Sequence, residues 1–274
     1  MDYIITTDTT ADLSQEYIKK NNLNLLSFNY TIDGVTYDRN NELPYQEFYD
    51  RMRKGSVPKT SLVNPEDVKS FFKNIQDKED VNILHIGFSS GLSGSYNSSR
   101  IAAEELMEEN SDKKIVVVDS LCASLGQGLL VHKALKLKEK GKSFDEVNEW
   151  VEQNKLNLCH FFTVDDLIYL FRGGRVSRTS AFAAGLLKIK PVLHVDKEGH
   201  RIPLSKVRGR KKSLMTMIDI MEKKMKQEEE QEIFISHGDC LDDAMYLAEN
   251  VKKRFGIDPM LINHIGPTIG AHSG

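Results

Sequence analysis

The sequence predicts an α/β fold, with an N-terminal Rossmann-like domain built on a parallel sheet and a smaller α/β domain after it. Short apolar runs with the length of buried strands, such as 81–86 and 115–118, alternate with segments of helical apolar spacing. Strands that alternate with helices predict a parallel sheet covered on both faces. The pattern changes at a polar joint near Lys155, so we place the domain boundary between 1–155 and 156–274.

Local signals define the elements of the first half. Ser14 is a typical N-cap for a short helix, and Asp33-Gly34 is a typical turn for a small hairpin. The predicted strands are Tyr3–Asp8, 25–32, Val35–Tyr37, 81–86 and 114–119. The predicted helices are Gln15–Lys20, 43–53, 66–74, 100–107, 129–140 and 144–153.

The second half mixes strands with longer charged helices. Segment 181–187 is apolar and small on every face, which predicts that it is buried or lines an apolar cavity. Glu198-Gly199 is a turn signal that joins two short strands. The predicted strands are Phe161–Thr163, 191–195, 202–204, 233–237 and 260–263, and the predicted helices are 211–230 and 242–255.

Composition excludes several classes of function. The chain has 274 residues and a net charge of −3, so no overall positive field points to nucleic acid. No apolar run approaches the ~20 residues that span a bilayer, and the N-terminus lacks a signal sequence, which predicts a cytoplasmic protein. The histidines and cysteines show no metal-ligand spacing and no nucleotide-binding motif is present, so we expect no metal and no cofactor.

The most informative stretch is a loop of glycine and serine at 87–99, between a predicted strand and a predicted helix. Such a loop lets the backbone approach a ligand, and it offers hydroxyls and the free N–H groups of a helix start. Asp8, the serines at 89–95 and Asp119-Ser120 all follow predicted strands. Because ligands bind at the carboxyl ends of parallel strands, we expect a site for an anion or an oxyanion there.

One alternative is a serine esterase. Gly87-Phe88-Ser89-Ser90-Gly91 matches the G-x-S-x-G nucleophile elbow, in which Ser89 would be the nucleophile. Asp119 or Asp165 and His237 or His272 follow in the order that such a triad requires. In a true elbow, however, the helix starts directly after the serine, and here further loop residues delay it.

Each of two basic segments has a structural and a functional interpretation. Segment 172–178 places three arginines around Gly173-Gly174, either as a solvated helix end or as a clamp for a phosphate or carboxylate. Segment 206–212 is a basic patch that fits an acidic protein surface better than nucleic acid. A regulatory or adaptor domain that uses this patch without a ligand is therefore a further alternative.

These pieces, in this order, resemble the DegV family, the fatty-acid-binding proteins that serve bacterial fatty acid kinase. The resemblance runs along the whole chain. The matching strings are Asp8-Thr9-Thr10-Ala11-Asp12-Leu13, Lys59-Thr60-Ser61, Ser89-Ser90-Gly91-Leu92-Ser93-Gly94-Ser95-Tyr96, Val118-Asp119-Ser120, Gly173-Gly174-Arg175, Lys188-Ile189-Lys190-Pro191, Lys206-Val207-Arg208, and Ile265-Gly266 with His272-Ser273-Gly274.

The resemblance implies that a long-chain fatty acid lies in a tunnel at the domain junction. Its carboxylate would be held by hydroxyls of two loops, Thr60 or Ser61 in one and Ser93 or Ser95 in the other, with Gly94 beside them. We favour Ser61 and Ser93. Candidate walls of the tunnel are 181–187, Phe28, Phe161 and Phe162, each of which could equally be ordinary core.

The resemblance also implies that the protein is a carrier rather than an enzyme. A separate dihydroxyacetone-kinase-like subunit would phosphorylate the bound acid to an acyl phosphate, and ligand exchange would involve transient membrane contact. Arg175 and His272 match family positions tied to phosphoryl transfer, and Arg208 matches one tied to docking the kinase. We expect uncharged donors to hold the carboxylate, because a direct arginine pair would make it a poorer nucleophile.

The sequence departs from the family pattern in two places. The loop after Ser61 carries one extra residue before Pro65, which predicts a slight shift of that loop. Family members usually continue with a short strand beyond the position of Gly274, which predicts weak anchoring of His272.

Overall fold

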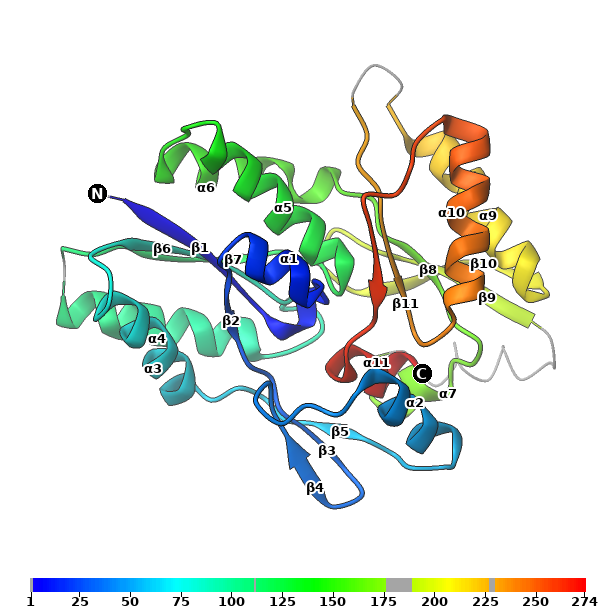
Figure 1. The fold of residues 1–274 in the computed structure, drawn as a ribbon, viewed down its shortest axis with the longest axis horizontal. Helices are drawn as coiled ribbons and strands as arrows, with labels where there is room; N and C mark the ends of the chain where they lie inside the picture. Colours follow the sequence, from blue (N-terminus) through cyan, green and yellow to red (C-terminus); the bar gives the residue numbers. More distant parts are fainter. Residues whose placement is uncertain (1, 111, 176–188, 227–229) are drawn as a thin grey trace.

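The central feature of the fold is a parallel sheet with the strand order β2-β1-β6-β7 (Figure 1). It is seen in a computed structural model that describes residues 2–110, 112–175, 189–226 and 230–274. Each neighbouring pair is parallel, and Ile83 of β6 lies between Ile4 of β1 and Ile115 of β7. The strands are β1 (Tyr3–Asp8), β2 (Asn24–Leu26), β6 (Asn82–Gly87) and β7 (Ile115–Asp119). This confirms the predicted α/β fold with its parallel sheet.

Helices cover both faces of this sheet, because alternate strand residues point to opposite sides. On one face, Leu84 and Ile86 pack in a core with α1 (Gln15–Lys20), α5 (Leu125–Glu139) and α6 (Phe144–Asn154). On the other face, Ile83 packs in a second core with α3 (Pro65–Gln76) and α4 (Ser95–Glu109). Helix α5 starts four residues before the predicted 129, since residues 125–128 already belong to it.

Within the described residues, three smaller sheets hold the other strands. An antiparallel sheet has the order β4-β3-β5, another has β10-β9-β8, and β11 pairs with β12 in parallel. The predicted strand 25–32 is wrong as one unit, because its ends belong to β2 and β3 in different sheets. The remaining strands are β3 (Tyr30–Ile32), β4 (Val35–Tyr37), β5 (Lys59–Thr60), β8 (Phe161–Thr163), β9 (Ile189–Val195), β10 (Arg201–Arg208), β11 (Phe234–His237) and β12 (Leu261–His264).

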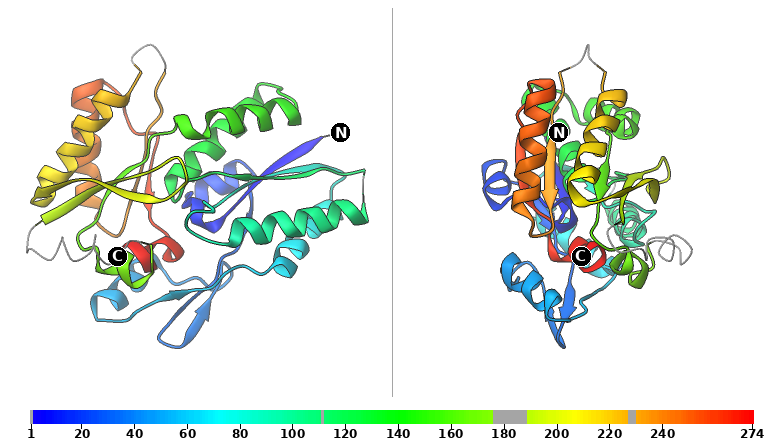
Figure 2. Two further views of the ribbon diagram at one scale, coloured as in Figure 1. Left: turned by 180° about the vertical axis from the view of Figure 1, so that it is seen from behind. Right: turned by 90° about the vertical axis from the view of Figure 1, so that its right-hand side faces the viewer.

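The remaining α-helices are α2 (Tyr45–Arg53), α7 (Ile168–Arg172), α9 (Arg210–Lys224), α10 (Leu241–Phe255) and α11 (Pro267–Ser273). Both views in Figure 2 show α9 and α10 side by side. Helix α9 ends at Lys224, short of the predicted 230, and α11 was not predicted. Segment 181–187 lies outside the described residues. No helix in the described part of the chain is long and apolar enough to cross a membrane. The domain boundary at residue 155 stays a prediction.

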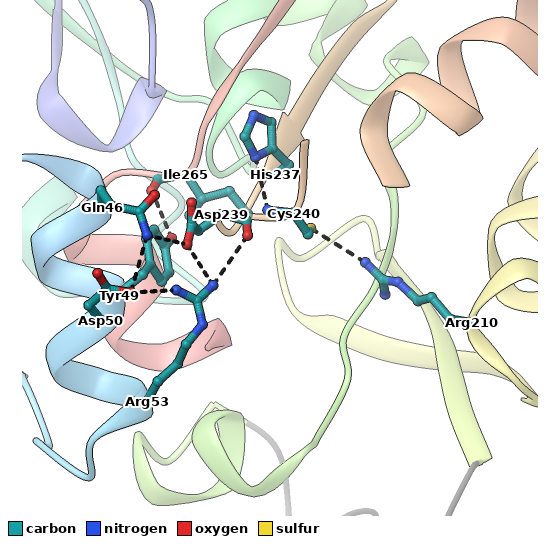
Figure 3. A network of polar contacts seen from close by, with 9 residues as sticks. All are labelled: Gln46, Tyr49, Asp50, Arg53, Arg210, His237, Asp239, Cys240 and Ile265. Carbon is teal, nitrogen blue, oxygen red and sulfur yellow. Dashed lines mark hydrogen bonds and ion pairs between the residues drawn. The ribbon is translucent and has the colours of Figure 1, made fainter. Parts of the chain in front are cut away.

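The C-terminal segment returns to the first half of the chain. Ile269 of α11 joins the core beneath α3 and α4, and Ala271 packs beside α2. Figure 3 shows the contacts of α2: Arg53 forms an ion pair with Asp239 at 2.6 Å, and the Tyr49 hydroxyl donates to the Ile265 carbonyl at 2.8 Å. The chain end is therefore fixed where the first and second halves meet.

Candidate functional site

The loops at the carboxyl ends of β1, β6 and β7 meet, as the sequence predicts. The Phe88 N–H donates to the buried carboxylate of Asp8 at 2.9 Å, and the Ser90 N–H donates to Asp119 at 3.1 Å. Beside them lies a cavity, called here the anion cavity. Its lining residues are Phe28, Thr60, Ser61, Phe88, Leu92, Ser93, Arg175, Arg201, Thr268, Ile269 and His272.

Hydroxyl groups from two loops line one side of the anion cavity. Ser61 follows β5, and its N–H donates to the Asn29 carbonyl at 3.3 Å. Ser93 belongs to the loop before α4, and its N–H donates to the Ser89 carbonyl at 3.1 Å. Backbone hydrogen bonds thus fix both loops, which places Ser61 and Ser93 at the cavity. The structure brings together Thr60, Ser61 and Ser93, the two favoured residues among them.

Arg175 reaches the cavity across the glycine and serine loop. Its Nε donates to the Leu92 carbonyl at 3.2 Å, and its Nη1 donates to the Gly173 carbonyl. Glycine at position 173 lets the backbone pack closely against the His272 ring, since a Cβ there would lie 2.1 Å from His272 Nδ1. The Gly-Gly-Arg segment is the C-terminal end of α7, where Arg172 is exposed, and it brings Arg175 to the lining of the cavity.

His272 is firmly placed, so the predicted weak anchoring is wrong. It lies on α11, and a hydrogen bond of 2.8 Å joins its Nε2 to Thr60 Oγ1. Burial, followed by the positive charges of Arg175 and Arg201, lowers its pKa to about 4. The ring is therefore neutral at pH 7. Its buried Nδ1 has no hydrogen-bond partner among the described residues.

Arg201, on the edge strand β10, was missed by the sequence analysis. Its Nη1 is buried and has no hydrogen-bond partner within the described residues. Burial and the charge of Arg175 lower the pKa of its guanidinium to about 10, so it remains charged at neutral pH. Thr268 and Ile269 of α11 also line the cavity and were not predicted as site residues.

The anion cavity therefore carries two positive charges and several neutral donors. In the described parts of the chain, neither Arg175 nor Arg201 pairs with a carboxylate, and unpaired buried charges are costly. An anionic ligand would offset that cost. The expectation that only uncharged donors hold the head group stays a prediction, and the lining of this cavity also includes two arginines.

The cavity is small. Its volume of about 20 Å³ suits a single water-sized group, so it does not have space for a long chain. Of the predicted wall residues, Phe28 lines it, whereas Phe161 and Phe162 pack in separate clusters of the second half. The predicted tunnel stays a prediction, since segment 181–187 is not among the described residues.

Three predicted residues lie outside the cavity lining. Ser95 is buried behind Ser93, and a hydrogen bond of 3.0 Å joins their hydroxyls. Gly94 is the N-cap of α4, where a Cβ would lie 3.3 Å from the Leu62 side chain. Arg208 is exposed at the end of β10, close to the exposed Lys211 and Lys212 at the start of α9.

The geometry does not support the esterase alternative. Ser89 is fully buried, and its Oγ donates to the Gly199 carbonyl at 3.1 Å. Asp119 instead accepts from the N–H groups of Ser90 and Leu121, and Asp165 forms an ion pair with Lys190 at 2.8 Å. His272 is bonded to Thr60. The serine is thus a structural link to the β9–β10 turn.

The same turn holds a group with metal-ligand spacing, Asp196, Glu198 and His200. Asp196 accepts from the N–H groups of both other residues at 2.9 Å, as an ordinary turn does. Glu198 and His200 are exposed. The carboxylate therefore has a structural role in the turn.

Comparison with known proteins gives one consistent family. The model of an uncharacterised protein family, the DegV family, matches residues 3–274. A DegV domain-containing protein of Clostridium perfringens is 45% identical over 275 residues, which cover 99% of this chain and 94% of that protein. A DegV domain-containing protein of Lactococcus lactis is 35% identical and covers 100% of this chain and 95% of its own length.

Comparison with solved structures indicates the same family. A Thermotoga maritima protein whose structure was described as revealing fatty acid binding is 29% identical, with a TM-score of 0.84 over 100% of this chain and 96% of that one. DegV of Bacillus subtilis, described as a fatty acid binding protein, is 26% identical, with a TM-score of 0.87 over the same shares. With a family model and curated relatives that span nearly its whole length, the chain belongs to the DegV family.

Proposed function

We propose that this protein binds a long-chain fatty acid, holds its carboxylate in the anion cavity, and presents it to a separate kinase subunit for phosphorylation to acyl phosphate. The observation that carries the proposal is the pair of arginines, Arg175 and Arg201, that face a hydroxyl-lined cavity without a carboxylate partner in the described residues. A ligand carboxylate supplies the missing negative charge. The fatty acids named with the solved relatives support this choice.

The walls of the cavity fit a ligand with one polar end. Phe28, Phe88, Leu92 and Ile269 line it, and all four belong to the apolar core beneath α3 and α4. Each methylene that leaves water contributes about 0.8 kcal/mol, so a long hydrocarbon tail supplies most of the affinity. The head group then needs charge compensation and hydrogen bonds, which the cavity provides.

Organic extraction of the purified protein, followed by mass spectrometry, is the first test, and we expect a stoichiometric fatty acid. Ser93→Ala should weaken the affinity for added fatty acid by about threefold to tenfold, because it removes one hydrogen bond to the head group. Ser90→Ala is the matched control, since Ser90 is exposed in the same loop and does not line the cavity. An extract without lipid, together with no measurable binding, would overturn the proposal.

The kinase step is the finer part of the proposal. Arg175 would stabilise the charge that develops on the transferred phosphoryl group, and the neutral His272 would hold or orient a proton there. The exposed Arg208, with Lys211 and Lys212, would dock an acidic surface of the kinase subunit. Transient contact with the membrane would allow the ligand to exchange.

Arg208→Glu tests the docking surface. We expect acyl phosphate formation with the kinase subunit and ATP to fall by more than tenfold, while the affinity for fatty acid stays unchanged, because Arg208 lies outside the anion cavity. Trapping the acyl phosphate with hydroxylamine measures the rate. Equal rates for Arg208→Glu and the wild type would show that this patch does not dock the kinase.

A further inference from the structure

Asp12 lies shortly after β1, and its hydrogen bonds link this part of the chain to the C-terminal segment. Its side chain is 4% exposed, and its Oδ1 accepts a hydrogen bond from the Gly266 N–H at 2.9 Å. Its backbone carbonyl accepts from the Asn263 side chain at 2.8 Å. A φ of 51° places Asp12 in the left-handed region, which few residues other than glycine, asparagine and aspartate adopt readily.

Gly266 is the residue from which α11 starts. It has no side chain of its own to cap the helix, and a Cβ there would lie 2.7 Å from Asp12 Oδ1. The hydrogen bond therefore requires both the carboxyl group and the glycine. On the preceding residue, the carbonyl of Ile265 accepts from Tyr49, as Figure 3 shows. Asp12 and Tyr49 thus hold the two sides of one peptide group, the one between Ile265 and Gly266, at the point where α11 begins.

Helix α11 carries three lining residues of the anion cavity, Thr268, Ile269 and His272. Any rotation or shift of its first turn would move all three relative to Arg175 and Arg201. We propose that Asp12 is a positioning residue for ligand binding: its hydrogen bond to Gly266 sets α11 so that Thr268 and His272 face the two arginines. For its effect on affinity this inference rests on the proposed function.

An asparagine can replace the aspartate in this role. Burial raises the pKa of Asp12 to about 8, so the carboxyl group is largely protonated at neutral pH and the neutral amide is a close substitute. An asparagine also keeps an oxygen acceptor for Gly266, and it tolerates the left-handed conformation. A glycine tolerates that conformation but removes the acceptor.

The experiment compares Asp12→Asn with Asp12→Gly in the full chain. Asp12→Gly should weaken the affinity for palmitate about tenfold, whereas Asp12→Asn should bind within about twofold of the wild type. In the ligand-free protein, NMR titration should give His272 a pKa of about 4 in the wild type and in Asp12→Asn. In Asp12→Gly that pKa should rise toward its ordinary value, because the ring becomes less buried and moves away from Arg175 and Arg201.

Asp33→Gly is the control for the glycine itself, since Asp33 has a φ of 52° in an exposed turn. It should leave both readouts unchanged. An unchanged His272 pKa in Asp12→Gly would overturn the proposal, and so would an Asp12→Asn variant that behaves like Asp12→Gly. The NMR readout needs no ligand. A shifted pKa in a protein that binds no palmitate would therefore refute the proposed function while the positioning role stands.

Discussion

Arg201→Met should abolish most fatty acid binding and, at the same time, make the ligand-free protein more stable. Removal of one partner of a buried charge pair costs about 2–5 kcal/mol, so the affinity should fall roughly 30-fold or more. In the ligand-free protein the same guanidinium has a buried Nη1 without a partner in the described residues, and it lies beside the like charge of Arg175. Replacing it with an apolar side chain should therefore raise the free energy of unfolding by about 1–4 kcal/mol.

These opposite changes separate a binding residue from a structural one. Affinity is measured by titration with palmitate, and stability by denaturant unfolding of the lipid-free protein. Lys206→Met is the matched control, because Lys206 is an exposed cation on the same strand, β10. If Arg201→Met bound palmitate as well as Lys206→Met does, the charge of Arg201 would have no part in holding the ligand.

Local patterns predicted the parallel sheet and the loops at its carboxyl edge, because strand length, helical spacing and turn residues are encoded within short windows. They could not predict Arg201. Its neighbours Ile202 and Leu204 are apolar and suggest an inward face, yet they are 39% and 44% exposed. Exposure alternates regularly along β10, so Arg201 lies on its less exposed face together with Pro203, Ser205 and Val207.

The helix α11 shows a second limit of local patterns. Pro267 suits the first position of a helix, but Gly270 lies in the interior of this short helix, which argues against it on propensity alone. Contacts from distant parts of the chain form it instead: Asp12 binds its first residue, and Tyr49 packs where Gly270 leaves no side chain. Family resemblance located His272 because the position was matched directly, whereas the helix that carries it depends on tertiary contacts.

Among substitutions that add a single methyl group at the site, Gly173→Ala should lower the free energy of unfolding most. Gly173 has a φ of −75°, so alanine would adopt its backbone conformation without strain. Its Cβ, however, would lie 2.1 Å from His272 Nδ1, well inside van der Waals contact. The imidazole must move, which breaks its hydrogen bond to Thr60. Overpacking and the lost hydrogen bond together should lower the free energy of unfolding by about 2–4 kcal/mol.

A double-mutant cycle isolates this clash from other effects of the alanine. His272→Ala removes the ring that the new methyl group meets, so Gly173→Ala should cost almost nothing in that background. Urea unfolding of the four lipid-free proteins gives the free energies. A coupling of about 2 kcal/mol or more is expected, because the two side chains compete for one volume. Additive effects would mean that Gly173 is required for another reason, and the close packing of the Gly-Gly-Arg segment on α11 would then not be what places Arg175 and His272 together.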